Sequence, residues 1–300
     1  MTEISYVDRI DANIPYLELF ENYIARSEPV VIVGAAAKWA ALSTWTPEFF
    51  VREYGDELVE LLRCGALERK TIPLREYFSL PKSDQDKWYL VDWDFRRRSR
   101  DLLKDIAELR QFRVDFLESI PARSRPDLMW IYIGHAGTHG PTHLDNFGSS
   151  AWLAVVEGTK RLVFPRFHPN TSGRSRINLF DGEDHPNVIL SQEAILLPGD
   201  VAFVPAGCWH AAINQTYCVS VTANFVDGVS FGSHRDFVTR QWFGREMLRD
   251  QAARVAEGCM GDERKETSLH LRCALEAYRQ WLADELDEVE RLRITLRSQG

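Results

Sequence analysis

The chain has 300 residues, 45% of them hydrophobic and 11% aromatic, and a formal net charge of -8 at pH 7. This length suits one large domain, or one domain with an appendage, and the apolar content excludes a disordered chain. The negative charge argues against bulk binding to nucleic acid or to an anionic membrane, because either partner needs a basic face.

The N-terminal part of the chain carries alternating strand and helix signals. The segment EPVVIVGAA at 28–36 predicts a short buried strand that ends in a glycine turn. TPEFFVREYG at 46–55 predicts a helix, since it has a threonine cap, a proline at the first helical position and a closing glycine. KWYLVDWDF at 87–95 predicts a strand, and the apolar spacing in 101–119 predicts a helix.

A basic run at 96–100 follows the second of these strands. Acidic residues flank it on both sides, at Asp92, Asp94, Asp101 and Asp105. We therefore expect a solvated segment whose charge is neutralised locally, and not a site for a polyanion.

From Met129 to Asp227 the pattern changes to short β-type runs separated by Gly, Pro and Asn. The runs are MWIYIG, PTHLD, AWLAVVEG, KRLVFP, AILLPGDVAFVP, HAAINQ and YCVSVTANFV. Many short strands with such punctuation predict a sandwich or a barrel. The polar, aperiodic stretch 166–193 predicts a long loop inside this region.

The C-terminal segment 275–300 has one apolar stripe at helical spacing, from Leu275 to Leu296. Two interpretations fit this stripe equally well. One is a helix through which two copies form a homodimer, and the other is a helix that packs on its own domain.

Cysteine usage and the N-terminus bear on the compartment. The five cysteines are scattered, and none sits in a C-x-x-C pair, so the sequence indicates neither a zinc knuckle nor a dithiol motif. The N-terminus carries acidic residues early, and no apolar stretch reaches about 18 residues. We expect a soluble, cytoplasmic protein that does not span a membrane.

Three residues of the β region suggest a metal site. His143 and Asp145 are two residues apart, so on a strand both side chains point to the same face and can act as adjacent ligands. His210 follows a strand and a turn, where a third ligand can come from a separate strand. For His210 alone a loop histidine bonded to backbone is the ordinary interpretation, but two histidines and one carboxylate together are the ligand set of non-haem Fe(II) sites.

Lys160 stands inside an otherwise apolar run, 17 residues after His143. If AWLAVVEG and TKRLVFP are adjacent strands joined near Gly158, Lys160 can point into the cavity of the metal. Its neighbour Arg161 must then face the other way, so one of the two is expected to face inward. A buried ammonium there would bind an anionic ligand, for example a carboxylate. The alternative is a strand-edge lysine that points to water.

These motifs together resemble the Jumonji-C (JmjC) family of oxygenases, in its protein-hydroxylase branch. The resemblance covers residues 28–232 and includes the order and spacing of THLDNFGSSAWLAVVEGTKRLVFP and GDVAFVPAGCWHAAINQTYCVSVTANFV. It implies a double-stranded β-helix (jelly-roll or cupin) core, which we place at 129–232. Together with the patterns above, we expect a mostly β fold with helices, in which N-terminal α/β elements occupy 1–128 and a C-terminal helical appendage occupies 233–300. The resemblance also implies Fe(II), 2-oxoglutarate and O2 as cofactor and co-substrates.

Carried over by position, the resemblance assigns His143, Asp145 and His210 to the iron, and Lys160 to the far carboxylate of 2-oxoglutarate. Thr222 and Asn224 fall at positions that line the 2-oxoglutarate pocket, and so does Tyr132. Many relatives have a threonine three residues before the first iron ligand, where this chain has Gly140. We expect the hydroxyl of Tyr132 or Thr222 to replace it.

The resemblance implies hydroxylation of a C–H bond on a peptide or protein side chain, with succinate and CO2 as co-products. Three alternatives remain open on the same residues: an N-methyl demethylase, a small-molecule hydroxylase, and a β-barrel that binds a metal or ligand without turnover. Formaldehyde release would identify the first, and turnover of 2-oxoglutarate would exclude the last.

The substrate is expected to contact the loops at 92–100, 135–142 and 166–190. His135 and His139 lie in the second of these loops, where ordinary loop histidines are the simpler interpretation. The tryptophan pairs Trp88/Trp93 and Trp39/Trp45 predict core packing. The acidic balance favours a basic substrate such as an Arg- or Lys-containing peptide.

Overall fold

The computed structural model describes residues 4–66, 68–119, 125–169, 171, 177–239, 269–270, 273, 276 and 279. The chain divides into two units. The first comprises Met1–Arg113, Pro126–Asn146 and Ser150–Phe225, and the second comprises Val114–Arg125, Phe147–Ser149 and Val226–Gly300. Every described strand lies in the first unit.

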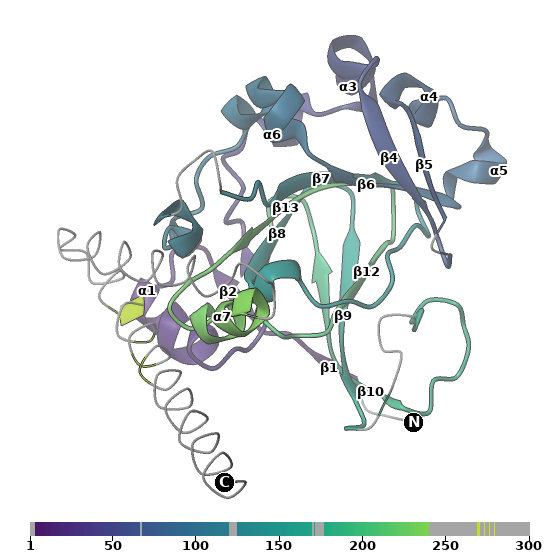
Figure 1. Ribbon diagram of the computed structural model, residues 1–300. Coiled ribbons are helices and arrows are strands. Elements are labelled where there is room, and N and C mark those ends of the chain that lie inside the picture. The colour runs from purple at the N-terminus through teal and green to yellow at the C-terminus, as the bar shows by residue number, and fades with distance from the viewer. Residues whose placement is uncertain are drawn as a thin grey trace, which may run out of the picture. The chain divides into compact units, whose positions relative to one another are not determined.

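The larger sheet of the first unit has nine described strands and is antiparallel except for the β2–β3 pair (Figure 1). Their order across the sheet is β2 (Arg9–Asp11), β3 (Val30–Val33), β11 (Val201–Val204), β8 (Ser150–Glu157), β13 (Cys218–Phe225), β7 (Met129–Gly134), β6 (Trp88–Trp93), β4 (Leu58–Arg63) and β5 (Arg69–Pro73). The strands predicted at 28–36 and 87–95 are confirmed as β3 and β6.

The smaller sheet has four described strands, in the order β1 (Ser5–Tyr6), β10 (Val188–Leu196), β9 (Lys160–Phe167) and β12 (Ala211–Asn214). β9 and β10 extend into both ends of the stretch 166–193, where Val188 pairs with Phe167, so the loop is shorter than the sequence predicted. PTHLD is not a strand, because His143 forms only an isolated bridge, with His210.

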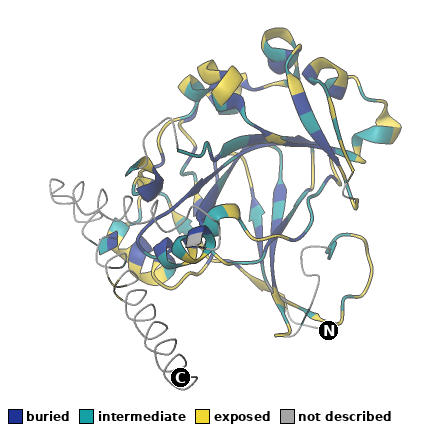
Figure 2. Cartoon of the chain, viewed as in Figure 1, coloured by how far each residue is buried: buried dark blue, intermediate teal, exposed yellow. Residues whose placement is uncertain are grey.

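The two sheets of the first unit pack face to face. One buried cluster contains Leu162, Phe164 and Leu196 from the smaller sheet and Val31, Val155 and Val204 from the larger one. Figure 2 shows these buried residues as dark blue stretches along the strands. This arrangement is a β-rich architecture of the cupin kind, with its core between the sheets.

Gly158 lies where the chain crosses from the larger sheet to the smaller one. β8 and β9 belong to different sheets, so the expectation that they pair as neighbours was wrong. Gly158 has a φ of +80°, and a Cβ at this position would lie 1.8 Å from the Tyr217 carbonyl oxygen. The crossing therefore requires glycine, since the left-handed backbone and the close contact both exclude a side chain.

Short helices surround the sheets of the first unit. They are α1 (Tyr16–Leu19), α2 (Ala41–Thr44), α3 (Pro47–Tyr54), α4 (Leu74–Phe78), α5 (Lys82–Gln85) and α6 (Phe95–Arg98), with a π-helical turn at Phe20–Ile24. α3 confirms the helix predicted at 46–55, since the Thr46 hydroxyl accepts a hydrogen bond from the backbone N–H of Phe49.

The helix predicted at 101–119 is wrong. The segment forms three 3₁₀ turns, at Arg100–Asp105, Arg110–Phe112 and Phe116–Ser119. Ile106 and Leu109 between them have extended backbone. The turns still bury the apolar side chains that produced the helical spacing. Phe112, for example, packs on the rings of Phe203 and Phe225, so tertiary packing decided the local conformation.

The basic run at 96–100 is neutralised in part, but Asp94 is the one flanking acid that the described contacts pair with it. It covers most of α6, where Arg96 pairs with Asp127 and Arg97 with Asp94. Three of the four tryptophans that were predicted to pack in the core do so: Trp39, Trp45 and Trp93 are buried. The remaining one, Trp88, is half-buried under the Lys70 ammonium, which lies 3.8 Å from the ring centroid.

The second unit contains the helix α7 (Phe231–Thr239). The Asp227 carboxylate accepts hydrogen bonds from the backbone and the hydroxyl of Ser230, immediately before this helix. Phe231 packs against Phe116, with ring centroids 6.0 Å apart. These contacts join the start of α7 to the 3₁₀ turn at Phe116–Ser119.

Three expectations reach beyond these observations. The C-terminal stripe at 275–300, with its dimerisation alternative, falls outside the described residues apart from Glu276 and Arg279. The boundaries at 128 and 232 stay predictions, although strands from both sides of residue 129 share the larger sheet. No helix among the described residues is long and apolar enough to cross a membrane.

We predict that Gly158→Ala destabilises the protein by at least about 2 kcal/mol more than Gly137→Ala. Both glycines have positive φ, but a Cβ at Gly137 meets no atom within 4 Å. Both variants therefore carry the left-handed backbone penalty of about 1–2 kcal/mol, and only Gly158→Ala adds a backbone collision. Urea unfolding of the two variants measures the difference, and equal stabilities would contradict the tight crossing.

Candidate metal centre and adjoining cavity

His143 and His210 are brought together by backbone pairing. The N–H of His143 donates to the carbonyl of His210 at 2.9 Å, and the N–H of His210 donates back at 3.0 Å. Their ring centroids are 4.2 Å apart. The pairing fixes the two imidazoles side by side although 67 positions separate them in the sequence.

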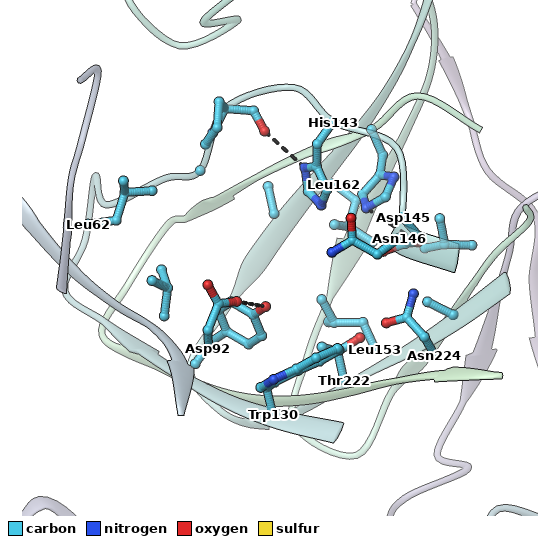
Figure 3. Close-up of a pocket in the computed structure, with 18 of the residues that line it drawn as sticks. Leu62, Asp92, Trp130, His143, Asp145, Asn146, Leu153, Leu162, Thr222 and Asn224 are labelled. Atoms are coloured by element: carbon cyan, nitrogen blue, oxygen red, sulfur yellow. Dashed lines mark hydrogen bonds and ion pairs between the residues drawn. The ribbon is translucent and has the colours of Figure 1, made fainter. Parts of the chain in front are cut away.

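Each imidazole is oriented by a second hydrogen bond. Nδ1 of His143 lies 3.0 Å from the Pro141 carbonyl oxygen (Figure 3), and Nδ1 of His210 lies 3.0 Å from the Cys208 carbonyl oxygen. A carbonyl oxygen only accepts, so both Nδ1 atoms carry the hydrogen. Nε2 of each ring is then left with a free lone pair, as in metal-binding histidines.

Asp145 completes the cluster. Its Oδ2 atom lies 3.9 Å from Nε2 of His210, and one ligand atom from each of His143, Asp145 and His210 falls within 4.8 Å of the others. Among the described residues, this buried Oδ2 atom has no hydrogen-bond donor. An acceptor-only oxygen without a donor, beside two imidazole lone pairs, fits a divalent cation with two histidines and one carboxylate.

The charge state of His143 suits a metal ligand. Burial and then the neighbouring His210 lower the pKa of the His143 imidazole to about 4, with Asp145 acting in the opposite direction. The ring opens onto the cavity, but the surrounding protein removes enough water to disfavour the imidazolium. At neutral pH His143 is therefore the neutral base that a metal needs.

A cavity of about 500 Å³ adjoins the three ligands. Its walls are mostly apolar, with Leu62, Val91, Trp130, Leu153, Leu162 and Val204 among them (Figure 3). Four charged side chains besides the histidines line it: Arg69, Asp92, Asp145 and Lys160. This is a partly open, mostly apolar pocket with a few fixed polar groups, the usual form of a small-molecule site.

Lys160 lines this cavity, as expected, and Arg161 points away and pairs with Glu193. The Lys160 side chain is 1% exposed, and its ammonium donates to the Tyr89 hydroxyl at 2.9 Å. Burial is the main cause that raises the pKa of Tyr89, so this phenol is neutral at neutral pH. Within the described ranges no carboxylate pairs with the ammonium, and the cavity therefore holds a buried cation that a bound anion can neutralise.

Thr222, Asn224 and Tyr132 also line the cavity. The Thr222 hydroxyl donates to the Trp152 carbonyl at 2.7 Å, and the Tyr132 hydroxyl donates to Asp92 at 2.7 Å. Both protons are thus bound to protein acceptors, so neither hydroxyl is available as the donor expected to replace a threonine at Gly140.

Sequence reasoning missed Tyr89, Arg69 and Trp130, which all line the cavity, and it included Asp92 only as the first residue of a loop expected to contact the substrate. KWYLVDWDF was predicted as a strand with Trp88 and Trp93 in the core, and only its alternation, with Tyr89 and Val91 on one face, could have indicated a cavity wall. Neither His135 nor His139 lines the cavity, in agreement with the simpler interpretation of both.

We predict that Lys160→Met leaves the free energy of unfolding of the ligand-free protein unchanged from wild type, or raises it by about 1–2 kcal/mol. Methionine keeps most of the volume and removes a buried charge that lacks a carboxylate partner. The exposed Lys104, which pairs with Asp101, gives the matched control Lys104→Met, with a change within about 0.5 kcal/mol. A loss of stability by more than about 1 kcal/mol in Lys160→Met would show that the ammonium is satisfied without a ligand.

Comparison with known proteins agrees with this site. A family model for a cupin-like domain matches residues 16–230. The chain is 28% identical over 240 residues to "Lysine-specific demethylase JMJ21" of Arabidopsis thaliana, covering 73% of this chain and 25% of that protein. It is 27% identical over 246 residues to "Bifunctional arginine demethylase and lysyl-hydroxylase psr-1" of Caenorhabditis elegans, covering 73% and 61%.

A third relative is "2-oxoglutarate and iron-dependent oxygenase JMJD4" of Homo sapiens, 27% identical over 266 residues, covering 75% of this chain and 62% of that protein. The matches thus span between a quarter and about three fifths of these relatives. Because the family model covers most of the residues, and the relatives are JmjC-type proteins, the chain belongs to the cupin-like family in its JmjC-type branch.

Proposed function

We propose that this protein is an Fe(II)- and 2-oxoglutarate-dependent dioxygenase that hydroxylates a C–H bond of a peptide or protein side chain. One observation carries the proposal: three ligand atoms within 4.8 Å of one another share a cavity with a buried lysine. A divalent cation fits the first group, and a carboxylate fits the second. A small acid with a chelating end and a distant carboxylate, such as 2-oxoglutarate, satisfies both at once.

When bound, iron would supply the centre at which O2 is reduced by 2-oxoglutarate. The overall reaction divides the two oxygen atoms of O2. One enters succinate as 2-oxoglutarate loses CO2, and the other enters the substrate, whose C–H becomes C–OH. Four electrons are needed, two from 2-oxoglutarate and two from the C–H bond.

The chain's own residues position these reactants. His143, Asp145 and His210 would hold the metal on one side, since their backbone and Nδ1 hydrogen bonds fix two of the three ligands. Lys160 would neutralise the far carboxylate of 2-oxoglutarate. Tyr89 is the better replacement for the threonine absent at Gly140, because its hydroxyl already contacts Lys160 and can donate its own proton to the same carboxylate.

The cavity keeps bulk water away from the reacting atoms. Leu153, Leu162 and Val204 form apolar wall, and Thr222 and Asn224 supply polar atoms along β13. Exclusion of water protects a reactive centre from side reactions and strengthens the electrostatic contacts of the bound acid. We infer a double-stranded β-helix for the two packed sheets, in line with this use of their interior.

The names of two relatives support a protein side chain as the substrate. One is named a lysine-specific demethylase, and the other a bifunctional arginine demethylase and lysyl-hydroxylase. Hydroxylation of an N-methyl group gives a carbinolamine that releases formaldehyde, so hydroxylase and demethylase differ in substrate and not in site. Hydroxylation is the first candidate and demethylation the second. We also propose a cytoplasmic location, consistent with free thiols at Cys64, Cys208, Cys218 and Cys273.

We predict that Asp145→Ala and Lys160→Met separate the two binding steps. Without O2, calorimetry should show that wild type binds Mn(II) and then 2-oxoglutarate, and that Asp145→Ala loses the metal. Lys160→Met should keep the metal and weaken 2-oxoglutarate binding by at least about 100-fold, because the partner of a buried carboxylate is removed. Lys104→Met should match wild type.

Succinate formation with Fe(II) in air completes this test. Wild type should form succinate, even in the absence of its substrate at a slow rate, and Asp145→Ala should not. Metal and acid binding without any succinate, also in the presence of a broad peptide mixture, would favour a binding protein over an enzyme. No metal binding by wild type would contradict the proposed function.

We predict that unmethylated peptides give succinate and a mass gain of one oxygen atom, without formaldehyde. A peptide library and its N-methylated counterpart are compared by mass spectrometry and a formaldehyde assay. Formaldehyde in proportion to succinate, seen with the methylated library alone, would establish the demethylase instead.

A further inference from the structure

A β-bulge in β6 stands at the wall of the cavity. Leu90 pairs with Ile133 and Trp93 pairs with Ile131, so two residues of β6, Val91 and Asp92, stand opposite the single residue Tyr132. Asp92 has a φ of +54°, in the left-handed region. Bulges of this kind commonly redirect a side chain beside a functional site.

The bulge changes the face to which Asp92 belongs. Tyr89 and Val91 line the cavity, whereas Leu90 is fully buried and Trp93 packs on Phe50. In a regular strand Asp92 would share the face of Leu90. With the extra residue it lines the cavity next to Val91, so the strand departs from regular geometry at the one position that carries a carboxylate.

The Asp92 carboxylate is held in place but remains accessible. Its Oδ1 atom accepts from the Tyr132 hydroxyl at 2.7 Å, and its Oδ2 atom accepts from Arg69 at 3.0 Å. Arg69 also pairs with Glu60. The Asp92 side chain is 41% exposed. The cluster of Asp92, Glu60 and Arg69 has a formal charge of one negative unit, and its members Asp92 and Arg69 line the cavity.

Deeper in the cavity the charges balance. With the ligands of the proposed function, the positive charges of a divalent metal and of Lys160 would equal the negative charges of the 2-oxoglutarate dianion and of Asp145. The charge left unbalanced is the formal negative charge of the cluster of Asp92, Glu60 and Arg69. Leu62 and Trp130 line the same cavity as Asp92, and Figure 3 shows Asp92 and Trp130 on the side of the cavity away from His143 in this view. An aliphatic stem can pack on Leu62 and Trp130, and an aromatic ring also favours a nearby cation.

We propose that Asp92 is a specificity-determining residue, which binds the cationic head of the substrate side chain at the mouth of the cavity. This inference rests on the proposed function for the identity of the site, and it adds which residue selects the substrate. The opposite assignment, in which Arg69 selects an anionic side chain, is an outcome of the same test.

The variant Asp92→Asn removes the charge with little other change. Asparagine tolerates the left-handed backbone, and its side-chain oxygen can still accept from Tyr132. The control is Asp101→Asn, which removes the same charge from an exposed aspartate that pairs with Lys104 and does not line the cavity. Circular dichroism and thermal unfolding check that both variants fold.

The experiment measures peptide binding to protein loaded with Mn(II) and 2-oxoglutarate, without turnover. The probes are four capped glycine pentapeptides with a central lysine, arginine, norleucine or glutamate. Wild type should bind the lysine and arginine peptides about tenfold more tightly than the norleucine peptide, as expected for a charge-assisted hydrogen bond. This ratio should fall to about one in Asp92→Asn and persist in Asp101→Asn.

Three results would overturn the inference: a wild type that binds the lysine and norleucine peptides equally or not at all, a ratio that survives in Asp92→Asn, and a preference for glutamate. The wild-type ratio decides the matter even if Asp92→Asn does not fold. Binding of Mn(II) and 2-oxoglutarate is measured on the same samples. If the wild type does not bind them, the proposed function is contradicted, independently of the result for Asp92. The peptide ratio would then be measured on the unloaded protein.

Discussion

The candidate site depends on one backbone contact, the mutual pairing of His143 with His210. A metal site of two histidines and a carboxylate needs its imidazoles at a fixed separation, and side-chain packing alone rarely gives it. Here two N–H to carbonyl hydrogen bonds set the spacing, and a carbonyl two residues before each histidine sets the ring orientation. The geometry of the ligands is therefore encoded in the main chain, and their side chains supply only the chemistry.

The buried lysine illustrates how the two sheets share one interior. β8 brings Ala151 and Leu153 to the cavity from the larger sheet, and after the turn at Gly158 the chain enters the smaller sheet with Lys160. The ammonium reaches the cavity because Lys160 has the same strand parity as Leu162 and Phe164, which are core residues. The Lys160 charge thus lies on the core-facing side of β9, at the first residue of the strand, where the apolar core borders the cavity.

Much of the candidate site could be predicted from the sequence. The spacing of His143, Asp145 and His210 indicated a metal cluster, and the parity of Lys160 and Arg161 indicated that one of the two faces inward. The pairing of strands could not be predicted in the same way, since β8 and β9 follow one another in the chain but lie in different sheets.

The cavity-facing side of β6 escaped prediction for a related reason. Tyr89 and Asp92 sit in a strand whose aromatic composition indicates core, and the bulge at Asp92 breaks the alternation on which such reasoning depends. The 3₁₀ turns at 100–119 show the same limit, because apolar spacing reports which side chains are buried and not the backbone that buries them. Long-range packing supplied what local pattern could not.

The outer end of the larger sheet has a consequence for how such proteins diversify. β4 and β5 form a hairpin at the sheet edge, and they contribute Leu62 and Arg69 to the cavity without contributing to the ligand set. An edge hairpin has a neighbouring strand on one side only, so its length and side chains can change with little effect on the pairing elsewhere. Under the proposed function, the part that would meet the substrate and the part that would hold the metal can therefore evolve, or be exchanged by an engineer, almost independently.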